Sequence, residues 1–184
     1  MLNNWPFYLL LISLLGLALG YDVATRRIPN WLVLAGLLAG LGWNFFGTQA
    51  TGGHALGVGN SLLGALTGLA LMLPFYFLRA MGAGDAKLMA AIGAFIGPMP
   101  VAGAVLLTFI AGGLLALAAA LWSRSLPRVL DNLRLMGMLA VSGRVSGLSL
   151  RDAPTTGRLP YAIAIVIGTG LQLWLAARGG WVFV

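Results

Sequence analysis

Acidic residues are scarce in this chain, which has four aspartates and no glutamate among 184 residues. Asp22 and Asp85 each stand at the edge of an apolar segment, whereas Asp131 and Asp152 lie in a semi-polar stretch. A carboxylate beside a membrane segment is costly and calls for a function. Two carboxylates that share one site do not ionise together easily, so one stays protonated. The ionised member can activate water while the protonated member polarises a carbonyl, which makes Asp22 and Asp85 a candidate pair for peptide hydrolysis.

Two other interpretations of these aspartates are open. Asp22 could pair with Arg26, one helical turn away, although such a pair contributes only about 0.2–0.5 kcal/mol on an exposed helix. The two acids could instead carry protons in a transporter or channel. A transporter would place polar groups at several depths, but the apolar segments 29–46, 56–78 and 101–122 are nearly free of them. A structural subunit of a membrane assembly machine is a further hypothesis.

Other catalytic groups are missing from the composition. The chain has no cysteine and one histidine, His54, so we expect no metal centre, no disulfide and no thiol chemistry. No Ser-His-Asp set falls on adjoining segments, and no His-Glu-x-x-His motif occurs. We therefore expect catalysis by carboxylates alone, without metal or cofactor.

The residues around Asp85 form a short motif, Gly82-Ala83-Gly84-Asp85. Glycines let the backbone turn sharply and let another chain approach closely. Lys87 follows two positions later, so it does not share a helix face with Asp85. It either anchors the chain at the membrane surface, tunes Asp85 or meets an acidic residue of a substrate.

The elements that hold these residues are predicted to be membrane helices. Sixty per cent of the residues are hydrophobic, 8% are charged and the mean hydropathy is +0.95, whereas soluble domains have about 25% charged residues. We predict an all-α integral membrane protein with a single domain over residues 1–184, embedded in the lipid bilayer as a bundle of about six transmembrane helices. Pro29 suits the first turn of the second helix. The predicted spans are 5–21, 29–46, 56–78, 84–97, 101–122 and 160–177.

The basic residues give this bundle an orientation. Ten of the eleven lie between spans one and two, three and four, or five and six, and only Arg178 lies elsewhere. The positive-inside rule places those connections in the cytoplasm and both termini outside. Asp22 then closes span one and Asp85 opens span four, both at the cytoplasmic face. Because so few other polar residues accompany the arginines, topology explains the net charge of +7 better than nucleic-acid binding does.

Two further patterns bear on packing. Segment 123–159, predicted to be cytoplasmic, contains a basic amphipathic stretch that either lies on the membrane surface or contacts an acidic partner. Glycine pairs with small-xxx-small spacing predict close helix packing; they are Gly16/Gly20, Gly36/Gly40, Gly64/Gly68 and Gly93/Gly97.

Taken together, the motifs resemble the type IV prepilin (leader) peptidases, a family of membrane aspartic proteases with a Gly-x-Gly-Asp motif. The similarity covers nearly the whole chain and rests on three stretches: Asp22 followed by Ile28-Pro29-Asn30, the run Gly82-Ala83-Gly84-Asp85-Ala86-Lys87, and Leu159-Pro160-Tyr161-Ala162.

The resemblance implies that Asp22 and Asp85 are catalytic and that Gly82, Gly84, Lys87, Pro29 and Asn30 support them. It implies a prepilin or pseudopilin substrate, cut on the cytoplasmic side of the bacterial inner membrane for pilus assembly or secretion. Longer family members carry an N-terminal cytoplasmic region, often with paired cysteines, that is associated with N-methylation. This sequence shows neither feature, so we expect peptidase without N-methyltransferase activity, as in the branch that serves Flp/Tad pili.

Overall fold

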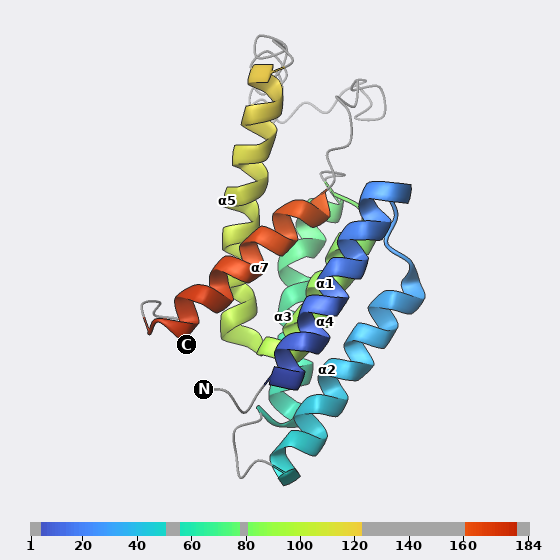
Figure 1. Ribbon diagram of the computed structural model, residues 1–184, viewed down its shortest axis with the longest axis vertical. Coiled ribbons are helices and arrows are strands. Elements are labelled where there is room, and N and C mark those ends of the chain that lie inside the picture. Colours follow the sequence, from blue (N-terminus) through green and yellow to red (C-terminus); the bar gives the residue numbers. More distant parts are fainter. Residues whose placement is uncertain (1–4, 51–55, 78–80, 123–160, 180–184) are drawn as a thin grey trace, which may run out of the picture. The chain divides into compact units, whose positions relative to one another are not determined.

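The computed structural model describes residues 5–50, 56–77, 81–122 and 161–179, and within these ranges all regular structure is helical (Figure 1). All six predicted spans coincide with a helix, and the protein is an all-α membrane protein. The helices are α1 (Trp5–Thr25), α2 (Asn30–Ala50), α3 (Gly57–Phe77), α4 (Ala83–Ile96), α5 (Pro98–Trp122) and α7 (Tyr161–Ala177).

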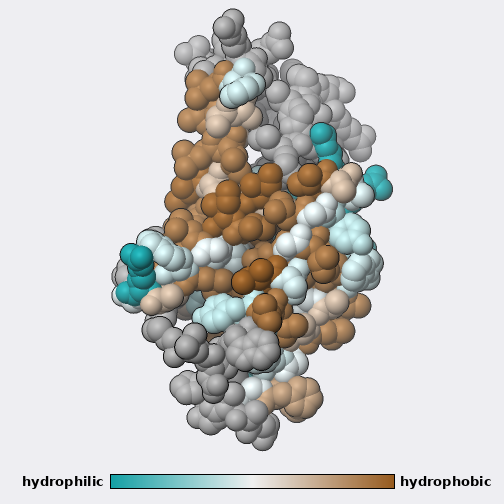
Figure 2. Space-filling view, in the orientation of Figure 1, coloured by the Kyte–Doolittle hydropathy of each residue, from teal (hydrophilic) through white to brown (hydrophobic). Residues whose placement is uncertain are grey.

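Four of these helices are long and apolar enough to cross a membrane: α1, α2, α3 and α5. Their outward faces carry large exposed hydrophobic side chains, such as Leu17 and Leu38, and hydrophobic surface dominates the face drawn in Figure 2. Exposed hydrophobic side chains of this kind are stable in a bilayer, where they contact lipid and not water. Helices α4 and α7 have 14 and 17 residues, fewer than the roughly 20 that cross a bilayer comfortably.

Three boundaries differ from the apolar pattern by three or four residues; α2 ends at Ala50 and not at residue 46, and the other two have clear reasons. Helix α1 continues past Asp22 to Thr25, because the charge ends the apolar run but not the helical backbone. Helix α5 begins at Pro98 and not at residue 101. Gly97 ends α4 in a left-handed conformation, with φ +84°, and its N–H donates to the Gly93 carbonyl at 2.8 Å. Proline is well suited to the first helical position that follows.

The chain divides into two compact units. The first unit comprises Met1–Gly112 with Pro160–Val184, and the second is Gly113–Leu159. The described part of the second unit is the end of α5. The predicted amphipathic segment 123–159 lies outside the described residues, and the single domain over 1–184 stays a prediction.

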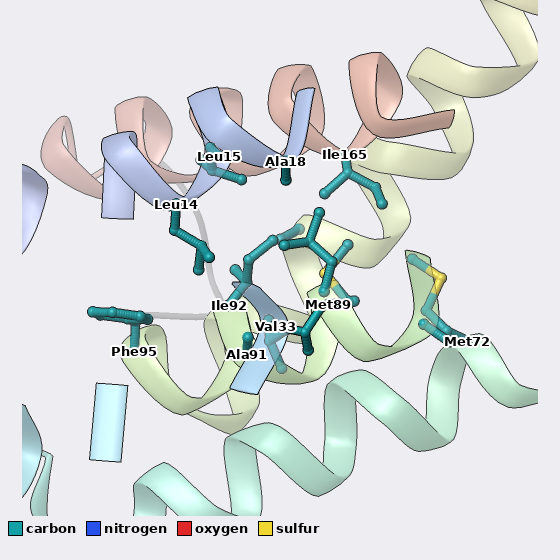
Figure 3. Close-up of a cluster of buried hydrophobic side chains, with 14 of the residues drawn as sticks. Leu14, Leu15, Ala18, Val33, Met72, Met89, Ala91, Ile92, Phe95 and Ile165 are labelled. Atoms are coloured by element: carbon teal, nitrogen blue, oxygen red, sulfur yellow. The ribbon is translucent and has the colours of Figure 1, made fainter. Parts of the chain in front are cut away.

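Helix α4 is the centre of the first unit, with ten of its fourteen residues buried. Helices α2 and α3 pack against it, and α1 and α7 also contact it. Figure 3 shows Leu14 of α1 and Ile165 of α7 pointing toward Met89 and Ile92 of α4. The short fourth helix is thus sheltered by its neighbours, which explains how it can be so short and still hold the core.

Glycines bring α3 and α4 into backbone contact. A Cβ placed on Gly64 would meet the carbonyl oxygen of Gly93, and a Cβ on Gly93 would meet the carbonyl oxygen of Gly64. The packing prediction therefore holds for these glycines. It is wrong for Gly16 and Gly20, where an added Cβ would meet nothing within 4 Å, because the spacing reports small residues and not which face is covered.

The end of α4 that lies away from Asp85 is fixed by a buried amide. Asn44 of α2 donates from Nδ2 to the Ala94 carbonyl at 2.8 Å, and Ser61 of α3 donates to the same carbonyl at 2.5 Å. The Leu56 N–H donates to Asn44 Oδ1 at 3.1 Å. These bonds hold α2, α3 and α4 together as one block.

Candidate active site

Asp22 lies in the last turn of α1 with 8% of its surface exposed. Its backbone carbonyl accepts the Arg26 N–H at 2.8 Å, and Thr25 Oγ1 donates to the Tyr21 carbonyl at 2.8 Å. Arg26 adopts φ +53°, the left-handed conformation that commonly ends a helix, although glycine is the usual residue there. The chain thereby leaves α1 just beyond Asp22 and turns toward α2.

Asp85 is the third residue of α4 and is 7% exposed. Its Oδ2 accepts the Gly82 N–H at 3.0 Å, and its own N–H donates to the Gly82 carbonyl at 3.2 Å. These bonds occupy backbone groups that a helix start leaves without partners. Asp85 therefore belongs to the cap of α4, and its carboxylate is held in one place.

The two glycines of the motif allow close packing, and neither adopts a backbone conformation that requires glycine. Gly82 has φ −80° and ψ 154°, an extended geometry open to any residue, and Gly84 does not have a positive φ. A Cβ on Gly84 would lie 3.1 Å from Ile28 Cβ, and a Cβ on Gly82 would lie 3.3 Å from Asp85 Oδ2. The expectation of a sharp glycine turn is wrong here, whereas the expectation of close approach is confirmed.

Asp22 and Asp85 lie near each other in the folded chain. They are close enough for the charge of Asp22 to act on Asp85 directly. Both are buried, Asp22 in the last turn of α1 and Asp85 in the first turn of α4, and these two helices contact each other.

The start of α7 completes the site. The Ala162 N–H donates to Asp22 Oδ2 at 3.2 Å, so Asp22 has a partner other than Arg26. Tyr161 lies close enough to Asp85 for an electrostatic interaction. The N-terminal turn of a helix offers free N–H groups and favours a negative charge. Sequence reasoning missed both contacts, and their only signal was the third stretch of the family resemblance.

The supporting residues form a link between the two aspartate-bearing segments. Lys87 Nζ donates to Asn30 Oδ1 at 3.0 Å, and both side chains are exposed. Pro29 precedes α2 and its carbonyl accepts the N–H groups of Leu32 and Val33 at 3.2 and 3.3 Å. Pro29 thus starts the helix from just outside it, and Lys87 joins α4 to that start.

This arrangement suits acid–base chemistry on water. Two buried carboxylates lie near each other, and each accepts one backbone N–H. The described residues contain no group of three metal-ligating side chains that could hold an ion.

The family comparison agrees with the geometry. The sequence model of the type IV leader peptidase family matches residues 9–117, which is more than half of the chain and includes both aspartates.

The chain belongs to the type IV leader peptidase family.

Family membership makes this protein a leader-peptidase-like protease, and therefore a hydrolase, set in a membrane. The matched residues cover most of α1, all of α2 to α4 and most of α5, while α7, which supplies a hydrogen bond to Asp22, lies beyond them. The corresponding comparisons with curated proteins and with solved structures gave no match.

Proposed function

We propose that this leader peptidase is an aspartic endopeptidase that removes the basic leader from type IV prepilin-like precursors, either Flp/Tad pilins or pseudopilins. Asp22 and Asp85 form its catalytic dyad. The observation that carries the proposal is that these two buried acids, from helices far apart in the sequence, lie together at one end of the bundle.

In the proposed reaction the ionised aspartate takes a proton from a water molecule, which attacks the carbonyl carbon of the scissile bond. The protonated aspartate donates a hydrogen bond to the carbonyl oxygen, where negative charge develops. The tetrahedral intermediate collapses as its C–N bond breaks and the leaving nitrogen takes a proton. The products are a free leader and a pilin with a new amino terminus, and the dyad again shares one proton.

The proposed orientation places the dyad at the cytoplasmic side of the bacterial inner membrane, with both termini outside. Arg26 and Arg27 lie four and five residues after Asp22, and Lys87 lies two residues after Asp85, so cations lie near the site end of the bundle. Arg178, at the other end of α7, stacks over Trp174 at 4.2 Å. This charge asymmetry supports the positive-inside assignment.

The alternative is a proton-coupled transporter or channel that uses the same aspartates. Family membership favours the peptidase. The remaining buried polar side chains of α5 and α7, which include Thr108 and Gln172, are neutral and cannot exchange protons at ordinary pH. A proton path along those helices therefore lacks carriers among the described residues.

The deciding experiment is cleavage of a co-expressed prepilin by Asp22→Asn and Asp85→Asn variants, followed as the shift from precursor to mature pilin on a gel. Each change should abolish cleavage while the protein stays membrane-inserted and folded. Asp152→Asn, which removes an aspartate from segment 123–159, is the matched control and should retain activity. Cleavage that survives either dyad substitution would reject the proposal, and proton flux lost in its place would favour the transporter.

A further inference from the structure

Three fully buried polar side chains between α5 and α7 have no protein partner. They are Thr108 of α5 and Thr169 and Gln172 of α7, each with no exposed surface. Both hydroxyl oxygens and both amide atoms of Gln172 have no hydrogen-bond partner among the described residues. Burying a polar group without a partner is unfavourable, above all within a membrane, where bulk water does not reach.

Similar side chains elsewhere in the protein behave differently. The hydroxyls of Ser13, Thr25 and Thr67 each donate to a carbonyl of the preceding helical turn. Asn44, the other fully enclosed amide, bonds to backbone groups of two other segments. The hydroxyls of Thr108 and Thr169 make no such local bond, so the α5–α7 group is an exception that needs a ligand.

Glycines let the two helices approach closely at this position. A Cβ on Gly103 would meet the Gln172 amide, with Cδ at 2.9 Å and Nε2 at 3.1 Å. A Cβ on Gly168 would meet the Thr108 hydroxyl and backbone, with Cα at 2.7 Å. The two contacts run in opposite sequence directions, as expected for antiparallel helices. They bring the polar side chains into one region about one to two helical turns long.

The chemistry of the group selects a small neutral ligand. Gln172 Nε2 can only donate, its Oε1 can only accept, and the two hydroxyls can do both. A metal cation would face the Nε2 hydrogens and find no carboxylate among the buried residues of this region. Water matches the mixture, since a buried water needs about two to four polar partners.

We propose that α5 and α7 bind ordered water between Thr108, Thr169 and Gln172. The water bridges the helices and fixes the rotation and depth of α7. Ala162, seven residues before Thr169 on the same face of α7, holds Asp22 through its N–H. The hydration site thus positions the helix that completes the active site, and it does so whatever substrate the enzyme cuts.

The first test detects the water directly. The chain contains two glutamines, Gln49 and Gln172, so protein labelled with ¹⁵N-glutamine in lipid nanodiscs gives two side-chain amide signals, assigned with a Gln49→Asn variant. The Gln172 amide should show magnetisation transfer to a long-lived water molecule. A Gln172 amide without such transfer would overturn the proposal, as would a signal that depends on Na⁺ or K⁺ in the buffer.

The second test uses the sign of a stability change. Thr108→Val and Thr169→Val should each lower the thermal midpoint by about 2–4 °C, the shift for one lost hydrogen bond in a chain of this size, and should weaken the Gln172 water signal. Without bound water each substitution removes an unsatisfied group, so the midpoint would rise or stay unchanged, and the proposal would fail. Thr67→Val, at a half-buried hydroxyl bonded to its own helix, should leave the water signal intact. If the valine variants do not fold, the wild-type measurement still decides.

Discussion

Gly64→Ala is the substitution that tests the packing of α4, the helix that carries Asp85, most directly. The added methyl group would meet the Gly93 carbonyl oxygen, and the Gly97 carbonyl carbon and Cα at 2.8 Å. All of these are backbone atoms, so no side chain can rotate away. Since ordinary contact begins near 3.4 Å, α3 and α4 have to separate by several tenths of an ångström or more.

The expected cost follows from two opposing effects. Overpacking a well-packed core costs about 1–3 kcal/mol, and rigid backbone neighbours favour the upper part of that range. Replacing glycine by alanine within a helix returns about 0.5–1 kcal/mol. We therefore expect a net loss of about 1–2 kcal/mol. Because α4 carries Asp85, a displacement near 1 Å would also lower kcat/KM, by up to about a hundredfold.

The assay pairs this variant with Gly16→Ala. Gly16 lies in α1 with the same small-xxx-small spacing, but an added Cβ there would meet nothing within 4 Å. Both variants would be unfolded by SDS titration in mixed micelles and assayed for prepilin cleavage. Gly16→Ala should be as stable as the parent or more stable, with full activity. If Gly64→Ala behaves in the same way, α3 and α4 are not in backbone contact and the reasoning is refuted.

Four further substitutions test the surroundings of the site and the opposite end of α4. Lys87→Met, Asn30→Leu and the double variant form a double-mutant cycle. The coupling in the free energy of unfolding should be about 0.5–1 kcal/mol, because the hydrogen bond between the two side chains is charged but exposed. Additive effects of the two substitutions would contradict this hydrogen bond. Asn44→Leu should lower the free energy of unfolding by about 2–3 kcal/mol, because it leaves buried backbone groups at the far end of α4 without hydrogen-bond partners. A thermal midpoint equal to the parent's would count against this hydrogen-bond network. Gly84→Ala should reduce cleavage with a destabilisation near 1 kcal/mol, because its methyl group presses on Ile28 beside Asp85; unchanged kcat/KM would show that this contact has no role in the site.

Much of the architecture could be predicted from the sequence, because bilayer thickness and the cost of charge limit where helices begin and end. The apolar runs located each of the six helices in the described part of the chain. The pairing of Asp22 with Asp85 followed from counting: the end of a first span and the start of a fourth lie at the same face of an antiparallel bundle. The inference that the two aspartates lie at one face required no knowledge of individual contacts, so errors of a few residues in the helix boundaries did not affect it.

The partners of each side chain could not be predicted in the same way. The donor to Asp22 is a backbone N–H at Ala162, and a backbone group has no side-chain signature. The bond from Lys87 to Asn30 depends on where two helix starts meet, which local periodicity does not encode. Glycine spacing did not predict which glycines pack against another helix. Gly16 and Gly64 have the same spacing pattern and differ only in whether another helix covers that face.

The length of α4 ties these observations to the proposed reaction. Fourteen helical residues extend about 21 Å, some 10 Å less than the hydrocarbon core of a bilayer. A helix this short cannot place both ends at the membrane surfaces, and its neighbours cover it instead. Asn44 and Ser61 fix the end of α4 that lies away from Asp85, and the proposed dyad lies at the opposite end.

In the proposed enzyme this end faces the cytoplasm, and the last turn of α1 and the first turn of α7 lie beside it. A prepilin has its scissile bond where a basic leader joins an apolar helix, so that bond reaches the same depth when the helix lies in the membrane. Lengthening α4 by one turn through insertion of Ala-Leu-Ala-Ala after Lys87 should raise Asp85 out of register with Asp22 and abolish cleavage. The same insertion after Trp122, outside the first unit, should leave cleavage largely intact. Retained activity in the α4 insertion, with the protein shown to be folded, would mean that depth does not select the bond that is cut.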